Sequence, residues 1–177
     1  GITREAAKMK HAPDGPWYYE QLELGYNYRM TDVQAALGIS QMKKLDDFVS
    51  ARHQLAKIYD EMLQSAPLQI PWRDVANYSG FHLYVVRLKL AEIHATQKDI
   101  FERMRAAGIG VNLHYIPIYR QPYYAAMGFD PQDWPEAEKY YSEAITLPLY
   151  PGLERQHQQE VVKHLLAPRP IGYQNIF

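Results

Sequence analysis

The segment 31–62 carries the strongest helical signal in the chain. Thr31 and Gln34 have the spacing of a capping box, in which each side chain satisfies an amide group at the helix start. Asp32 lies in the first turn, where the helix dipole favours a carboxylate. Apolar residues then recur at steps of three and four, at Val33, Leu37, Leu45, Phe48, Val49, Leu55, Ile58, Tyr59 and Met62. The pattern predicts one long helix, with a break near Lys44–Asp47, that connects two bodies.

From residue 81 onward, strand and helix patterns alternate. The segment Phe81–Leu90 is apolar on both faces, which is typical of a central strand. Thr96 is a helix cap, Gly108 suits a left-handed helix stop, and Pro148 places its strand at a sheet edge. We expect strands at 81–90, 109–115 and 145–150, and helices at 97–107, 136–144 and 153–166.

These elements predict an α+β fold, a small sheet with covering helices, preceded by the long connecting helix. We expect three parts: a loop-rich tail at 1–30, the connecting helix at 31–65, and a small α+β domain at 66–177. Gly38 interrupts good helix formers next to Ala35 and Ala36, which predicts close packing of this helix on another backbone.

Composition narrows the class of protein. The 177 residues are 47% hydrophobic and 22% charged, as in ordinary folded domains. The absence of cysteine excludes a disulfide scaffold, a cysteine-based zinc site and a thiol nucleophile, and favours a cytoplasmic protein. The net charge of -1 gives no reason to bind nucleic acid. No apolar run reaches the roughly 18–20 residues of a membrane span, and we expect no metal site.

Two stretches carry candidate binding residues. In Gly25–Met30 (GYNYRM), Asn27 and Arg29 precede the capped helix and are suited to an anion; alternatively, Asn27 only supports a turn. In Asn112–Pro117 (NLHYIP), His114 and Tyr115 end a predicted strand in a tyrosine-rich loop. Such a wall suits a sugar or another ring, although a hydrophobic corner with satisfied hydroxyl groups is an equally open interpretation.

The segment GYNYRMTDVQAALGISQMKKLDDF, residues 25–48, resembles the DegT/DnrJ/EryC1/StrS family of sugar-nucleotide aminotransferases. The stretches DGPWYYEQLELGYNYRM, HYIPIYRQPYY and ITLPLYPGL resemble the branch that acts in pseudaminic acid synthesis. The resemblance implies the C-terminal small domain of a type I transferase that depends on pyridoxal 5'-phosphate (PLP). It implies homodimers that move an amino group from glutamate to a UDP-linked 4-keto-6-deoxy sugar, with no role for a membrane.

The resemblance also assigns residues. Asn27 matches the family's contact to the PLP phosphate of the partner subunit, Arg29 matches a residue on the substrate side, and His114 and Tyr115 match the lining of the sugar-nucleotide pocket. The tail 1–30 would belong to the large cofactor domain and the dimer interface. No lysine here has the sequence context of the family's cofactor-bearing lysine.

We therefore expect a C-terminal portion that holds no catalytic residue and does not bind PLP covalently. The alternative is a non-catalytic α+β module for binding or dimerisation.

Overall fold

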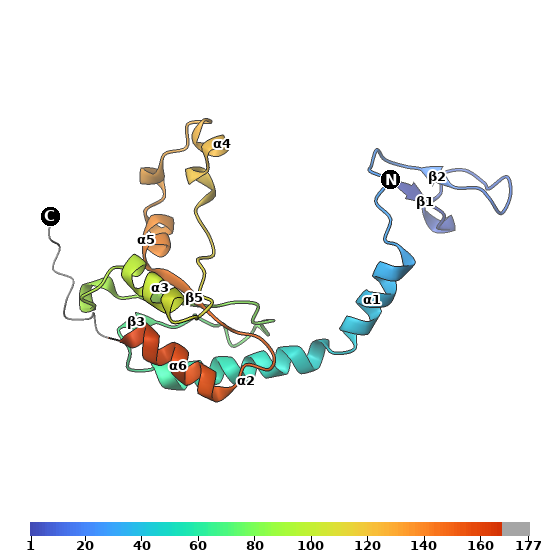
Figure 1. The fold of residues 1–177 in the computed structure, drawn as a ribbon. Coiled ribbons are helices and arrows are strands. Elements are labelled where there is room, and N and C mark those ends of the chain that lie inside the picture. Colours follow the sequence, from blue (N-terminus) through green and yellow to red (C-terminus); the bar gives the residue numbers. More distant parts are fainter. Residues whose placement is uncertain (168–177) are drawn as a thin grey trace. The chain divides into compact units, whose positions relative to one another are not determined.

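The computed structural model describes residues 1–167, which divide into two compact units, Gly1–Lys43 and a second unit that begins at Lys44. Figure 1 shows both units, with the α-helices and most of the strands labelled. The helices are α1 Asp32–Met42, α2 Leu45–Leu63, α3 Gln97–Ala106, α4 Pro122–Ala125, α5 Pro135–Glu143 and α6 Arg155–Leu166. The strands are β1 Ile2–Thr3, β2 Glu20–Gln21, β3 Leu68–Gln69, β4 Tyr84–Leu88 and β5 Ala144–Leu147. Short 3-10 turns lie at Ala6–Lys8, Leu90–Glu92, Ile118–Arg120 and Pro131–Asp133.

The first unit has almost no apolar core. Its antiparallel pair, β1 with β2, joins Ile2 to Gln21 and Thr3 to Glu20. The predicted capping box at the start of α1 is present: the Thr31 hydroxyl accepts from the Gln34 amide, and the Gln34 side chain accepts from the Thr31 amide. No residue of α1 is buried, and a Cβ added at Gly38 would meet no atom within 4 Å in this chain. The close packing expected at Gly38 is therefore absent from the described residues.

The predicted long helix is two helices. A turn at Lys43 and Lys44 separates α1 from α2, so the break falls at the start of the predicted stretch. The stripe along α2 is buried at Leu55, Tyr59 and Leu63, whereas in α1 the stripe is exposed. The same apolar pattern is therefore exposed to solvent along α1 and buried in the core along α2.

The second unit is built on a three-stranded antiparallel sheet in the order β3-β4-β5. As predicted, β4 is central and β5, which is followed by Pro148, lies at the edge. β4 is shorter than the predicted 81–90 strand. Phe81 has a φ of 44°, a left-handed conformation that an L residue in a strand does not adopt, so the chain turns there before Tyr84.

The predicted strand at 109–115 was wrong. Only Asn112 pairs, through an isolated antiparallel bridge to Thr146 of β5. Alternation of apolar residues indicated a strand, but a strand also needs a partner along its whole length, and this segment pairs with β5 at Asn112 alone. The chain beyond Asn112 instead leaves the sheet as an irregular segment.

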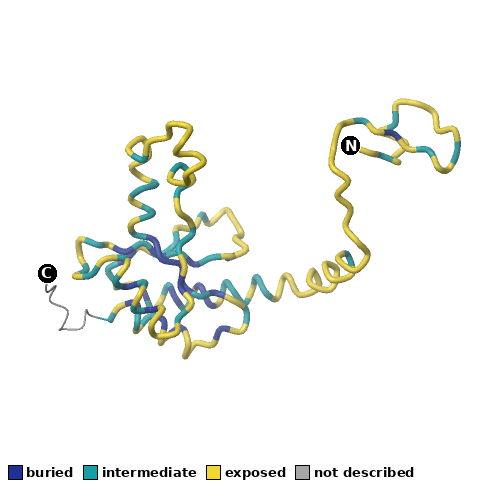
Figure 2. The backbone as a smooth tube through the Cα atoms, turned by 45° about the horizontal axis from the view of Figure 1, so that its top comes forward, coloured by how far each residue is buried: buried dark blue, intermediate teal, exposed yellow. Residues whose placement is uncertain are grey.

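The core of the second unit lies between the sheet and the helices α2, α3 and α6. Figure 2 shows buried residues gathered there, whereas residues 115–134 are mostly exposed. α6 packs against both α2 and α3. It buries Gln158, Val161 and Leu165; the predicted Val162 is only half-buried, and Leu166 is exposed. The fully buried Gln158 donates from Nε2 to the Leu55 carbonyl at 2.9 Å, which ties α6 to α2.

Side chains of helix α3 donate hydrogen bonds to carbonyl groups at the C-terminal ends of two other helices. The Thr96 capping box and the positive φ of Gly108 bound α3 as predicted. From its first turn, Gln97 Nε2 donates to the carbonyls of Tyr141 and Ala144 at the end of α5, at 2.9 and 2.7 Å. Further along, Arg103 donates to the carbonyls of His164 and Leu165 at the end of α6. These carbonyls lack partners within their own helices, so α3 satisfies them from outside.

Candidate functional site

The four predicted site residues form two pairs, one in each unit. Asn27 and Arg29 lie between β2 and α1 in the first unit. His114 and Tyr115 lie after the Asn112 bridge in the second unit. Each pair is described within its own unit.

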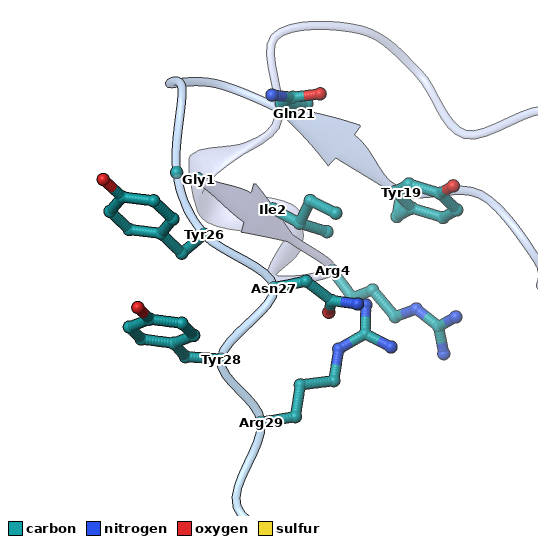
Figure 3. Close-up of a pocket in the computed structure, with 10 residues that line it drawn as sticks. Gly1, Ile2, Arg4, Tyr19, Gln21, Tyr26, Asn27, Tyr28 and Arg29 are labelled. Atoms are coloured by element: carbon teal, nitrogen blue, oxygen red, sulfur yellow. The ribbon is translucent and has the colours of Figure 1, made fainter.

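Asn27 and Arg29 line an open cavity of about 900 Å³ in the first unit, which Figure 3 shows. The segment 26–29 alternates: the rings of Tyr26 and Tyr28 stack on one side, 5.1 Å apart, and the side chains of Asn27 and Arg29 extend on the other. Because the backbone there is extended, successive side chains point to opposite faces. The alternation places both polar groups on the cavity side.

Arg4 completes the polar side of this cavity, and the sequence analysis missed it. It follows β1, lies toward Asn27 and Arg29 in Figure 3, and its guanidinium is 5.9 Å from the centre of the Tyr19 ring. The pairing of β1 with β2 brings it there from a distant part of the sequence. No local motif marks Arg4; the only signal is its positive charge.

The cavity lining contains two arginines, one asparagine and no acidic residue. Guanidinium and amide groups are hydrogen-bond donors, and arginine matches the geometry of phosphate. We call Arg4, Asn27 and Arg29 the anion cradle. The amide nitrogen of Gln34 is taken by the Thr31 hydroxyl and Asp32 occupies the first turn of α1, so side chains rather than that helix end would hold the anion.

The alternative role of Asn27 in a turn finds no support. Within residues 1–167 its side chain makes no hydrogen bond, and it is exposed in the cavity. An asparagine that stabilises a turn bonds to the backbone nearby. The amide of Asn27 is therefore available to a ligand.

His114 is fixed by two polar neighbours. Its Nδ1 lies 2.9 Å from the Thr146 hydroxyl of β5, and its Nε2 lies 3.5 Å from the Asn112 amide nitrogen. The His114 ring is half-buried at the edge of the sheet. It does not end a strand as predicted, because this segment pairs only at Asn112.

Tyr115 is presented to solvent beside it. Its side chain is 69% exposed, and its ring meets the His114 ring edge to face at 4.7 Å. The peptide bond between the two residues is cis. An anchored imidazole next to an exposed phenol forms a wall that suits a polyhydroxylated ring. We call His114 and Tyr115 the aromatic corner.

A charged cluster adjoins the aromatic corner. Glu138 of α5 accepts from the Tyr119 hydroxyl at 2.9 Å and from Arg120 Nε at 2.8 Å. The hydrogen bond from Arg120 holds the pKa of Glu138 below its ordinary value, and desolvation together with Glu138 raises the pKa of Tyr119. Glu138 is thus an anion and Tyr119 a neutral donor at neutral pH.

Neither a metal-binding cluster nor a membrane-spanning helix is found in the described part of the chain. In residues 1–167 no three His, Cys, Asp or Glu side chains gather where they could hold a metal ion. The same residues include no helix with the length and apolar character needed to cross a membrane.

Comparison with known proteins identifies the family of the chain. The DegT/DnrJ/EryC1/StrS aminotransferase family matches residues 4–166. Spore coat polysaccharide biosynthesis protein SpsC of Bacillus subtilis is 33% identical over 162 residues, 90% of this chain and 42% of its own length. A UDP-4-amino-4,6-dideoxy-N-acetyl-beta-L-altrosamine transaminase of Campylobacter jejuni is 35% identical over 136 residues, 76% of this chain and 35% of its own.

Solved aminotransferases share the fold. Helicobacter pylori PseC, an aminotransferase involved in the biosynthesis of pseudoaminic acid, superposes with a TM-score of 0.75 at 27% identity, over 88% of this chain and 42% of its own. The putative sugar aminotransferase Spr1654 of Streptococcus pneumoniae in its PMP-form gives 0.76 at 27% identity, over 94% of this chain and 41% of its own. The α+β prediction is confirmed, and the chain spans about two fifths of the length of these solved proteins. The chain belongs to the DegT/DnrJ/EryC1/StrS aminotransferase family.

Proposed function

We propose that this chain is the C-terminal part of a PLP-dependent aminotransferase that moves an amino group from glutamate to a UDP-linked 4-keto-6-deoxy sugar. The observation that carries the proposal is the anion cradle, in which Asn27 and Arg29 of the GYNYR segment lie with Arg4, in a chain that matches the family from residue 4 to residue 166. Relatives named as sugar-nucleotide transaminases support the substrate class.

The residues of the cradle fit the phosphate of PLP. Two guanidinium groups and the NH₂ of an amide offer hydrogen-bond donors, and the lining contains no carboxylate to repel a dianion. We assign Asn27 to the cofactor phosphate of a partner subunit in a homodimer, and Arg29 to the substrate side. The tail 1–30 would then belong with the cofactor domain and the dimer interface. PLP, when bound, supplies the electron sink that the exchange of an amino group requires.

The aromatic corner would hold the sugar nucleotide. In this role the Tyr115 ring covers a face of the sugar, and His114, held by Thr146, keeps Tyr115 in place. A group that positions substrate contributes to binding and orientation, not to the transfer of the proton. The proton would be moved by the cofactor-bearing lysine, which we place outside this chain.

One experiment tests the need for that lysine. The isolated chain is mixed with PLP, reduced with borohydride and digested, and the modified peptides are identified by mass spectrometry. We expect only weak, scattered labelling of surface lysines. Stoichiometric labelling of one specific lysine would show that the chain carries its own catalytic lysine.

A second experiment tests the aromatic corner in the complete enzyme. His114→Ala should slow the single-turnover half-reaction with the ketosugar about tenfold or more, and leave the half-reaction with glutamate near wild type, because glutamate does not occupy the nucleotide pocket. An equal loss in both half-reactions would assign His114 to proton transfer or to folding.

A further inference from the structure

The segment that presents the aromatic corner is not held by a core. We call residues 115–134 the arm; Figure 1 shows it, with α4, extending from the sheet of the second unit. From residue 112 to residue 143, all of which the structure describes, no residue is buried. Apolar burial therefore cannot fix where Tyr115 stands, and polar contacts must do so.

Helix α5 is anchored to the sheet at its C-terminal end. Glu143 pairs with Arg87 of β4, which donates from Nε and Nη2 at 3.0 and 2.8 Å. Gln97 of α3 closes the last turn of α5 through two carbonyls. The chain then continues directly into the buried strand β5. The end of α5 is thus a fixed point from which the rest of the helix extends toward the arm.

Two further residues of α5 hold the chain at the aromatic corner and shortly after it. The Tyr140 hydroxyl donates to the His114 carbonyl at 3.2 Å, immediately before Tyr115. Two residues earlier on α5, Glu138 binds Tyr119 and Arg120, four and five residues after Tyr115. The Arg120 guanidinium also lies 4.9 Å from the centre of the Tyr141 ring. One helix thus holds the chain within the corner and again just beyond it.

We propose that Glu138 and Tyr140 are positioning residues that hold the aromatic corner in place for a sugar nucleotide. That the corner binds a sugar nucleotide rests on the proposed function; that α5 fixes the corner rests on the contacts alone. Glu138 serves two donors with one carboxylate, and charged hydrogen bonds are the stronger kind. Its loss releases Tyr119 and Arg120 together.

The first measurement needs no activity. The amides of Arg120 and Gln121 bond to the carbonyls of Pro117 and Ile118 in the 3-10 turn that follows the corner. In Glu138→Ala, hydrogen exchange at these two amides should accelerate about tenfold. Glu136→Ala is the matched control, because Glu136 lies on the same helix, is exposed and makes no side-chain contact within residues 1–167. Unchanged exchange in Glu138→Ala would overturn the proposal.

The second measurement uses the complete enzyme loaded with PLP. Glu138→Ala and Tyr140→Phe should raise KM for the UDP-ketosugar about tenfold and leave the glutamate half-reaction unchanged. Glu138→Gln, which keeps an acceptor oxygen, should restore part of the loss. An equal fall in both half-reactions, or wild-type KM in both variants, would overturn the proposal. If the wild-type enzyme accepts no UDP-ketosugar, the proposed function fails, and the exchange rates alone decide whether α5 fixes the corner.

Discussion

At the residue scale, the most unusual group in the first unit is a buried carboxylate. Glu20 accepts from the amides of Lys10 and His11 at 2.7 and 2.8 Å and from the Tyr18 hydroxyl at 3.1 Å. The hydrogen bond from the Lys10 amide is the largest of the causes that lower its pKa. One side chain thereby holds the loop between β1 and β2, which has no apolar core to order it.

This carboxylate predicts a pH dependence. A group whose pKa is lowered by folding stabilises the folded form above its unfolded value, and the contribution is lost as pH falls through the lowered folded value. We expect the protection factors of the Lys10 and His11 amides, which correct for the intrinsic pH dependence of exchange, to fall as pH drops below the ordinary glutamate pKa. In Glu20→Gln the protection factors of these amides should be lower at neutral pH and should change little on acidification. Glu23→Gln, a change at an exposed position, is the control; equal behaviour of the two variants would contradict the prediction.

Asn27 predicts a loss of cofactor retention. In the complete enzyme, Asn27→Ala should weaken PLP binding by about one to two decades, because a hydrogen bond to a charged group contributes about 1.5–3 kcal/mol. The melting temperature of the apoenzyme should not change, since the Asn27 side chain makes no bond within the described residues. Equilibrium dialysis and thermal melts measure the two effects. Gln21→Ala, at the same cavity, is the matched control, and an unchanged PLP dissociation constant for Asn27→Ala would remove Asn27 from the site.

At the scale of elements, α3 stabilises its neighbours through their ends. Burial lowers the pKa of Arg103, yet its charge remains and binds two carbonyls of α6. We expect Arg103→Met to lower the free energy of unfolding of the second unit by about 1–3 kcal/mol, a fall of several degrees in melting temperature. Arg105→Met, on the same helix at an exposed position, should change the melting temperature by less than about one degree. Similar losses in both variants would refute the capping role.

Structural features that depend on neighbouring residues could be predicted from the sequence, and features that depend on distant residues could not. The capping boxes at Thr31 and Thr96 and the left-handed Gly108 depend on residues within one turn, and each is present. The strand predicted at 109–115 depended on a partner that alternation cannot reveal. Arg103 and Gln97 likewise act on helices far along the chain.

The residues of the candidate site also separate into those that local spacing predicts and those that only the fold brings together. Asn27 and Arg29 share a cavity because their spacing of two in an extended segment puts them on one face. Arg4 joins them only through the pairing of β1 with β2, and Thr146 reaches His114 only through the sheet. Neither partner could be predicted from a local pattern.

At the scale of the whole molecule, the large apolar side chains of α1 are uncovered. Val33, Leu37, Ile39 and Met42 are between 62% and 80% exposed. Val33 and Leu37 lie one turn apart on the same side of α1, and we expect the isolated chain to self-associate through them, because exposed apolar patches tend to associate. The double variant Val33→Lys with Leu37→Lys should shift sedimentation toward the monomer, whereas Gln41→Lys should not. A wild-type chain that stays monomeric at high concentration would contradict this expectation.

The pairing of β4 with β5 sets the order in which the second unit can fold. Tyr84 meets Leu147 and Arg87 meets Ala144, and the whole segment of α3, the arm and α5 lies between these partners in the sequence. Closing so long a loop costs chain entropy before the strands gain contacts, so folds rich in such pairings form slowly. Helices α2 and α3 can form early from local contacts. We therefore expect the pairing of β4 with β5, which needs α5 to bring the chain back to the sheet, to form late.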